Sequence, residues 1–198
     1  MDIYSYVESA RAKSPWDFGN NTLYALCRDN PEHTDVGIVV AKIWLIGRSY
    51  AAAIERRKNK ADGNDDFYVT TVAPAIIKSG LDAWIRKANN SKSWGDMIEA
   101  HHKTTQLFNE ISGLEKRSLA SKYLHFHVPK LFYIYDTRAV AALRKLKSFT
   151  GRAGRKADNC DNEYRKLAEK CRALAVRIKQ DYNIDMSPRE IDNFLLAI

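Results

Sequence analysis

The stretch Ser118-Leu-Ala-Ser-Lys-Tyr-Leu-His-Phe-His-Val-Pro-Lys-Leu-Phe-Tyr-Ile-Tyr-Asp136 places one lysine, Lys122, in a mainly apolar and aromatic run. The run predicts a helix over residues 116–127 that Pro129 closes, because proline cannot continue a helix. Asp136 then stands where an N-cap opens the next helix. A helix, a short connection and a capped helix are the pattern of an all-α protein.

The rest of the chain also has helical patterns. A long helix is predicted from Asp35 to about Lys58. Its first part, Val36 to Ile46, is apolar on every side, and a helix without a polar face belongs in the centre of a domain. No strand pairs and no repeats stand out. The sequence therefore predicts one compact, multi-helix, all-α domain over residues 1–198. Two helical lobes, 1–112 and 113–198, with a cleft between them, are the alternative.

Composition places the chain in a reducing compartment. The 198 residues are 45% hydrophobic, which is enough for a substantial core. The three cysteines are odd in number and lack C-x-x-C spacing, which argues against a disulfide framework. The N-terminal residues do not resemble a signal peptide, and the longest apolar stretch is too short to span a bilayer. We expect a cytoplasmic protein without a membrane partner.

The net charge of +8 is concentrated in the second half of the chain. Residues 1–99 carry 13 basic and 13 acidic side chains, whereas residues 100–198 carry 19 basic and 11 acidic ones. The segment from Thr137 to Ala157 has no acidic residue and seven basic ones: Arg138, Arg144, Lys145, Lys147, Arg152, Arg155 and Lys156. Such a run attracts polyanions, so we expect nucleic acid as the partner. The alternative is a solvated helix face followed by a loop.

Lys122 and Asp136 are the candidate catalytic residues. Among apolar neighbours the pKa of a lysine falls, which makes a nucleophilic amine available near neutral pH. Asp136 at a helix N-terminus should stay ionised, and an ionised carboxylate stabilises the cationic sugar that forms in glycosidic cleavage. The alternatives are that Lys122 extends to solvent along an apolar surface and that Asp136 acts only as a helix cap.

The order of these features resembles the helix-hairpin-helix DNA glycosylase superfamily. Ile111-Ser112-Gly113-Leu114-Glu115 is similar to the family's hairpin turn, and Ile134-Tyr135-Asp136 is similar to its aspartate segment. The resemblance covers residues 105–147. It implies a hairpin that binds DNA phosphates, a catalytic lysine and a catalytic aspartate. Glu115 replaces the second glycine of the hairpin.

The resemblance assigns the aspartate more firmly than the lysine. Counted from Gly113, the family's lysine position falls on Arg117, which we include among the expected nucleic-acid contacts. The segment Ala120-Ser121-Lys122 with Pro129 and Ile134-Tyr135-Asp136 is also similar to uncharacterised bacterial proteins that share a Ser/Thr-Lys, Pro, Tyr-Asp pattern. That similarity favours Lys122 over Arg117 and implies no activity by itself.

Arg48, Glu55 and Tyr135 are the expected pocket residues. Arg48 and Glu55 are seven positions apart on the predicted long helix and so share one face of it. Arg48 follows an apolar run, and a buried arginine needs an anionic partner. The alternative to a pocket wall is a structural ion pair of Arg48 with Glu55 or with Asp136.

Neither a metal nor another cofactor is expected. The histidine pairs 125/127 and 101/102 have spacings that place the two rings on different sides of a helix. Arg28 and His33 match the Arg-x4-His spacing of the HEPN ribonucleases, but Pro31 interrupts the helix that this motif requires.

The sequence thus predicts a nucleic-acid-binding protein, with DNA as the expected partner. The most specific prediction is a DNA glycosylase-like enzyme that cleaves the N-glycosidic bond of a modified or damaged base. It would flip that base into a pocket between helices. A non-catalytic DNA- or RNA-binding or regulatory module is the alternative, and a ribonuclease that uses Arg28 and His33 is a third.

Overall fold

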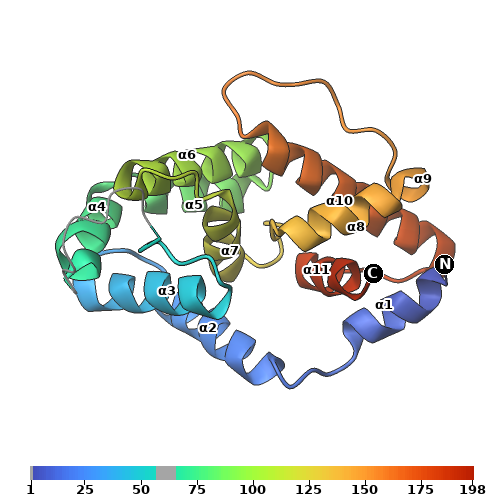
Figure 1. The fold of residues 1–198 in the computed structure, drawn as a ribbon, viewed down its shortest axis with the longest axis horizontal. Coiled ribbons are helices and arrows are strands. Elements are labelled where there is room, and N and C mark those ends of the chain that lie inside the picture. The colour runs from blue at the N-terminus through green and yellow to red at the C-terminus, as the bar shows by residue number, and fades with distance from the viewer. Residues whose placement is uncertain (1, 57–65) are drawn as a thin grey trace.

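The computed structural model describes residues 2–56 and 66–198, and within these ranges every regular element is a helix (Figure 1). This confirms the all-α prediction. The elements are α1 (Ile3–Arg11), α2 (Asp17–Asp29), α3 (Val36–Ser49), the π-helix η1 (Tyr68–Val72), α4 (Ala73–Lys78), α5 (Leu81–Ser91), α6 (Trp94–Ser112), α7 (Arg117–His127), α8 (Thr137–Lys145), α9 (Lys147–Thr150), α10 (Asn162–Tyr182) and α11 (Pro188–Ala197). No helix in the described ranges has both the length and the apolar character needed to cross a membrane.

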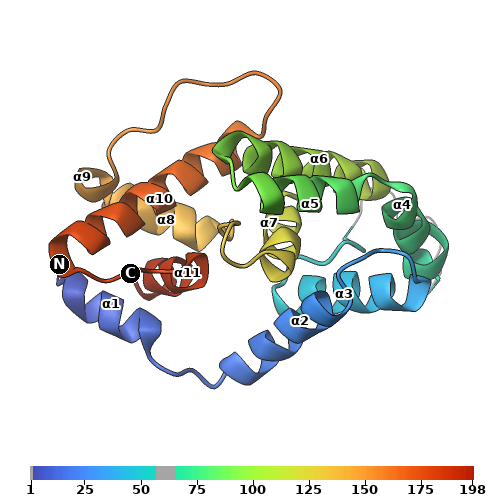
Figure 2. The same ribbon diagram turned by 180° about the vertical axis from the view of Figure 1, so that it is seen from behind.

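The helices surround two hydrophobic clusters. The first cluster is formed by α2 to α7 and the connections between them, and it also takes Tyr164 and Ala168 from α10. The second cluster is formed by α1, α8, α10 and α11. Figures 1 and 2 show the two groups of helices side by side, with α1 against α11. Tyr133 and Tyr135 pack against both clusters and so connect them.

The two clusters do not follow the lobe boundary at residue 112. Helix α7 lies C-terminal to that boundary but belongs to the first cluster, and α1 lies N-terminal to it but belongs to the second. The physical reason is that α1 buries its apolar face on α11 rather than on its sequence neighbour α2. The chain passes from the first cluster to the second between Phe132 and Ala139, and only Tyr164 and Ala168 of α10 return to the first. The single domain and the cleft stay predictions.

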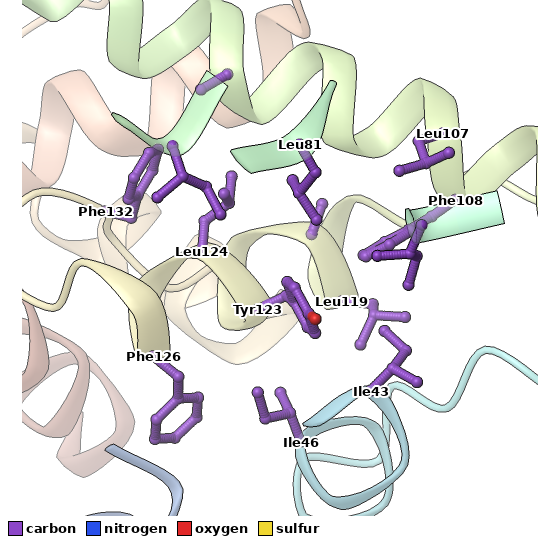
Figure 3. Packing of buried hydrophobic residues seen from close by; sticks show 14 of the residues in the cluster. Ile43, Ile46, Leu81, Leu107, Phe108, Leu119, Tyr123, Leu124, Phe126 and Phe132 are labelled. Atoms are coloured by element: carbon purple, nitrogen blue, oxygen red, sulfur yellow. The ribbon is translucent and has the colours of Figure 1, made fainter. Parts of the chain in front are cut away.

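Helix α7 is the central element of the first cluster. Every residue from Leu119 to Phe126 is buried, and α7 packs against α2, α3 and α6. Figure 3 shows Ile43 and Ile46 of α3 near Tyr123 of α7, with Phe108 of α6 on another side. This complete burial explains why the one lysine of the segment has no route to the surface along its own helix.

The long helix predicted to reach Lys58 is shorter, because α3 ends at Ser49. Ala51 adopts φ 51°, a left-handed conformation, and the Ala52 N–H donates to the Gly47 carbonyl at 2.8 Å. A Cβ at Gly47 would lie 3.2 Å from the Cα of Ala53, so glycine permits the chain to fold back here. The last two predicted positions, 57 and 58, lie outside the described residues.

Candidate functional site

Lys122 is buried at the centre of the candidate site. Its side chain is 3% exposed, and the amine donates to Ser118 Oγ at 2.8 Å and to the Tyr50 carbonyl at 3.4 Å. Burial lowers the pKa of Lys122, while the nearby carboxylate of Asp136 acts in the opposite direction. The alternative of a lysine that extends to solvent is therefore wrong, and the amine is held in place by three neighbours.

Asp136 completes the pair. Its Oδ2 lies 3.6 Å from Lys122 Nζ, and its Oδ1 accepts a hydrogen bond from the Arg138 N–H at 2.8 Å. The side chain is 31% exposed, so the carboxylate is the part of the pair that reaches solvent. Asp136 is thus the N-cap of α8 and an ion-pair partner at once. A buried amine beside a partly exposed carboxylate is an arrangement able to attack and stabilise an electrophilic carbon.

Two residues of α11 that the sequence did not indicate also belong to the site. Asp192 is buried, its Oδ2 lies 3.3 Å from Nη1 of Arg189, and its Oδ1 has no hydrogen-bond partner within the described part of the chain. Burial raises the pKa of Asp192 to about 6, although Arg189 and Lys122 favour its ionised form. The carboxylate of Asp192 also acts electrostatically on Lys122. Lys122 therefore interacts with two acidic groups from two helices.

Arg189 connects α11 to the first cluster. Its guanidinium donates to the hydroxyl oxygens of Tyr24 and Tyr50, at 3.1 and 2.6 Å. These tyrosines lie 165 and 139 positions away in the sequence, so no local spacing could reveal the contact. The one available signal was a basic and an acidic residue, three apart, in an amphipathic last helix.

Arg117 is engaged by two carboxylates. Its Nε lies 2.6 and 2.8 Å from the two oxygens of Asp161, and its Nη2 lies 2.6 Å from Glu115. The guanidinium also lies 5.2 Å from the ring centroid of Tyr135, one of the expected pocket residues. Asp161 is almost completely buried and caps α10. The position that the family pattern assigns to lysine thus holds a structural ion pair in this chain.

The turn expected at residues 111–115 is present. Helix α6 ends at Ser112, Gly113 adopts φ 68°, and α7 begins at Arg117. A left-handed residue just after a helix terminus is the usual use of glycine. Glu115 is exposed at 59% and directs its charge to Arg117. The turn and the loop before α10 border a cavity of about 410 Å³ that includes Arg117 and Lys156.

Arg48 and Glu55 form an ion pair at 2.5 Å, the pairing that the structural alternative named. They do not share a helix, because α3 ends before Glu55. Arg48 is 59% exposed rather than buried, and its partner is Glu55 rather than Asp136. Glu55 also accepts a hydrogen bond from the hydroxyl of Tyr68. A role of these residues in a pocket stays a prediction.

The basic run lies on the surface. Its members on α8, α9 and the following loop are all exposed: Arg138, Arg144, Lys145, Lys147, Arg152, Arg155 and Lys156. The loop between α9 and α10 arches outward (Figure 1), and its Gly154 and Arg155 carbonyls accept hydrogen bonds from Arg165 of α10. Two of the side chains also tie α8 to the end of α11, since Arg138 donates to the Leu196 carbonyl and Lys145 to that of Ile198. The placement suits contact with a polyanion.

The ribonuclease alternative does not fit the structure. His33 is 2% exposed, its Nδ1 lies 2.5 Å from Asp82, and its Nε2 lies 2.7 Å from the Tyr123 hydroxyl. Arg28 is exposed and pairs with Asp29 at 2.9 Å. Both ring nitrogens of His33 are thus engaged by neighbouring side chains, which leaves neither available as a catalytic base. Among the described residues, no three His, Cys, Asp or Glu side chains come together as metal ligands would.

The site is thus assembled from α7, the start of α8, the end of α3, α2 and α11. It brings together Lys122 and Asp136 as predicted, and adds Arg189 and Asp192. It does not include Arg117, whose guanidinium pairs with Glu115 and Asp161. Comparison of the chain with protein-family models, with curated proteins and with solved structures finds no match.

Proposed function

We propose that this protein binds nucleic acid, with DNA as the expected form, and cleaves the N-glycosidic bond of a modified or damaged base. The observation that carries the proposal is the contact between Lys122 and Asp136, a buried amine 3.6 Å from a carboxylate that is 31% exposed. The resemblance of residues 105–147 to the helix-hairpin-helix DNA glycosylases supports the same chemistry.

In the proposed reaction Lys122 acts as the nucleophile. Burial lowers the pKa of Lys122, which raises the fraction of neutral amine near pH 7. The amine attacks C1′ as the bond between C1′ and the base nitrogen breaks, and the base leaves with the electron pair and takes up a proton. Asp136 stabilises the positive charge that develops on the sugar. Water activated by Lys122 is the alternative nucleophile.

The exposed basic run supplies the binding surface in this proposal. Arg138 lies two positions after Asp136, in the first turn of α8, so the basic run begins beside the site. Lysine and arginine side chains that contact phosphates hold a duplex without reading its sequence. The base would leave the stack to reach Lys122.

The test is covalent trapping. With borohydride present, the protein should form a stable adduct with DNA that carries an abasic site, because the amine and the sugar aldehyde form a reducible imine. The Lys122→Met variant should lose the adduct and keep its fold, since methionine fills a similar volume without a buried charge. A wild-type protein that gives no adduct and releases no base from a panel of damaged substrates contradicts the proposal.

The matched control is Lys42, another fully buried lysine. Its amine donates to the Glu32 carbonyl at 3.1 Å, and burial lowers the pKa of Lys42 as it does that of Lys122. Lys42→Met should therefore keep the adduct. Loss of the adduct in both variants would indicate damage to the fold rather than loss of a nucleophile.

A non-catalytic nucleic-acid-binding module is the second candidate. One observation favours it: the Lys122 amine already has hydrogen-bond and ion-pair partners and is 3% exposed. In that case DNA binding depends on the exposed basic run alone. Lys122→Met would then bind DNA as the wild type does, and neither protein would release a base.

A further inference from the structure

The guanidinium of Arg189 lies in a box of three aromatic rings. Its central carbon is 6.0 Å from the ring centroid of Tyr24, 5.4 Å from that of Tyr50 and 5.6 Å from that of Phe126. The ring of Phe126 contacts both tyrosine rings, with centroids 4.7 Å from Tyr24 and 5.4 Å from Tyr50. We call Tyr24, Tyr50 and Phe126 the aromatic box. Aromatic faces attract cations such as guanidinium, and they also stack with flat aromatic rings such as nucleobases.

Each nitrogen of the guanidinium has its own acceptor. Nε donates to the Tyr24 hydroxyl, Nη2 to the Tyr50 hydroxyl, and Nη1 lies 3.3 Å from Oδ2 of Asp192. The other oxygen of Asp192 has no partner within the described residues, although the side chain is 3% exposed. The walls of the box are therefore arranged to receive a row of N–H donors.

The two tyrosine hydroxyls can only accept from the occupant. The Tyr50 hydroxyl donates its proton to Oδ1 of Asn20 at 2.5 Å. His125 Nδ1 lies 2.8 Å from the Phe132 carbonyl, which accepts only, so Nδ1 carries the ring proton. Burial lowers the pKa of His125 to about 3, so the ring is neutral and its Nε2 accepts the Tyr24 proton at 2.6 Å. The lone pairs of both hydroxyls are thus left for the occupant.

The box and its occupant come from different parts of the fold. Phe126 belongs to the first cluster, and Tyr24 and Tyr50 pack against it. Arg189 is on α11, whose buried side chains belong to the second cluster. The Arg189 side chain is 18% exposed, so the box is not sealed from solvent. A shift of α11 relative to α2 and α7 would carry Arg189 and Asp192 away together and leave Tyr24, Tyr50 and Phe126 in place.

We propose that the aromatic box is a binding subsite for a guanine base, and that Arg189 occupies it in this structure with a group of the same shape and donor pattern. The inference rests on the proposed function. Guanine contains a guanidine unit, and its N1–H and N2–H₂ form a flat donor edge like that of arginine. Tyr50 belongs to the box and also gives its carbonyl to Lys122, so a base held there lies beside the nucleophile.

The donor pattern separates guanine from the other bases. Adenine and cytosine present an acceptor nitrogen next to their amino group, which would meet a hydroxyl lone pair. Thymine and uracil have one N–H between two carbonyl oxygens. Hypoxanthine has N1–H and lacks the 2-amino group. A site with buried acceptors penalises a ligand that leaves them unpaired.

The test measures nucleoside binding and needs no catalysis. Arg189→Ala empties the box, so guanosine should bind this variant at least about tenfold more tightly than the wild type, because the competing side chain is gone. Guanosine should bind more tightly than inosine, and inosine more tightly than adenosine. Titration calorimetry and thermal shift measure both the gain in guanosine affinity and the order of the three nucleosides. Equal affinity for the three nucleosides, or none for any of them, overturns the proposal.

Methylguanidinium provides a second readout with a matched control. It should raise the melting temperature of Arg189→Ala by refilling the box, at concentrations too low to denature. Arg177 also lies over an aromatic ring, at 5.9 Å from Phe149, and pairs with Asp181 at 2.6 Å, but it is exposed. Arg177→Ala should show no rescue. Equal effects on both variants, or none on Arg189→Ala, contradict the proposal.

If Arg189→Ala does not fold, the wild-type protein tests whether the aromatic box binds guanine. Its preference for guanosine over inosine should disappear in the Tyr24→Phe, Tyr50→Phe double variant, which keeps the rings and removes the acceptors. A preference that survives in this variant overturns the assignment. Guanosine binding without a borohydride adduct would leave the subsite in place and remove the proposed cleavage, so the two failures are distinguishable.

Discussion

The carboxylate of Asp136 divides its oxygens between two tasks: Oδ2 lies 3.6 Å from Lys122 Nζ, and Oδ1 accepts the N–H of Arg138 in the first turn of α8. One residue therefore links the candidate nucleophile to the start of a helix. The ion pair with Lys122 requires the negative charge of Asp136, whereas the helix cap requires only a good hydrogen-bond acceptor.

Substitution of Asp136 should separate these tasks. Asp136→Asn keeps the cap but leaves the buried amine of Lys122 without its carboxylate, a loss of stability that Asp136→Ala shares. Asp136→Ala should be less stable than Asp136→Asn by about 1 kcal/mol, because it also loses the cap. Both should release base at least about 100-fold more slowly, because the stabilising charge is gone. Both should still form the adduct on abasic DNA, where no glycosidic bond remains. Denaturant unfolding and single-turnover assays measure the two effects, and full activity in Asp136→Asn would refute the catalytic role.

Removal of Arg117 should affect stability and leave the chemistry in place. Arg117→Ala leaves the buried carboxylate of Asp161 without its partner, which costs about 3 kcal/mol. Folded Arg117→Ala should still be trapped on abasic DNA through Lys122. The double variant Arg117→Leu, Asp161→Asn is the control, since it removes both charges and should recover much of the loss. An unfolding free energy unchanged in Arg117→Ala would show that the ion pair contributes nothing.

Charge reversal in the loop between α9 and α10 should weaken DNA binding. Arg152 and Arg155 are exposed, so Arg152→Glu with Arg155→Glu should leave the melting temperature unchanged. The slope of log affinity against log salt should become shallower by about 0.9 for each lost phosphate contact. Fluorescence anisotropy over a salt series measures the affinity and this slope. Arg28→Glu, at another exposed position, should bind as the wild type does. Unchanged affinity and slope in the loop variant would exclude this surface as the binding face.

Stability should fall as the solution becomes acidic. Burial lowers the pKa of His101, His125 and His127 to about 3, below the value of about 6.5 in an unfolded chain. The unfolded state therefore binds more protons between these values, and the stability that is present above pH 6.5 is lost as the pH falls toward 3. Denaturant unfolding between pH 4 and 7 measures the slope. Stability that is constant across this range would contradict the burial of neutral histidines.

The carboxyl group of Asp192 should make the folded state less stable as the pH rises, which is opposite to the effect of the histidines. Burial raises the pKa of Asp192 to about 6, above about 3.9 in an unfolded chain, so the folded state binds the proton more tightly. Its ionisation costs stability as the pH rises from about 4 to about 6, on the order of 3 kcal/mol in total. Asp192→Asn should therefore be more stable than the wild type at pH 7 and equal to it near pH 4.

Local rules were enough to predict one half of the candidate site. An aspartate before an apolar helix predicts a cap, and Asp136 caps α8. Lys122 and Asp136 are 14 positions apart across a short connection, which brought them together as expected. The sequence left two alternatives for Lys122, a buried amine or a side chain that extends to solvent, and the structure shows the buried one.

The other half of the candidate site depends on contacts between segments that are far apart in the sequence. The partners of Arg189 lie 139 and 165 positions away, and Asp161 lies 44 positions from Arg117. Single-sequence patterns carry no information on such pairs. The predicted helix to Lys58 was too long because Ala51 to Ala53 have high helix propensity, whereas the chain turns back onto Gly47. Packing overrides propensity there.

The pairing of α1 with α11 has a consequence for synthesis on the ribosome. Helices α2 to α7 are contiguous in sequence and can assemble most of their cluster as soon as they emerge, before Tyr164 and Ala168 of α10 complete it. Helix α1 leaves the ribosome first, but the surface that buries Ile3 and Val7 is completed only by Ile191 and Phe194. Its apolar face therefore stays uncovered until α11 emerges, which lengthens the time during which that face is open to chaperones and to aggregation.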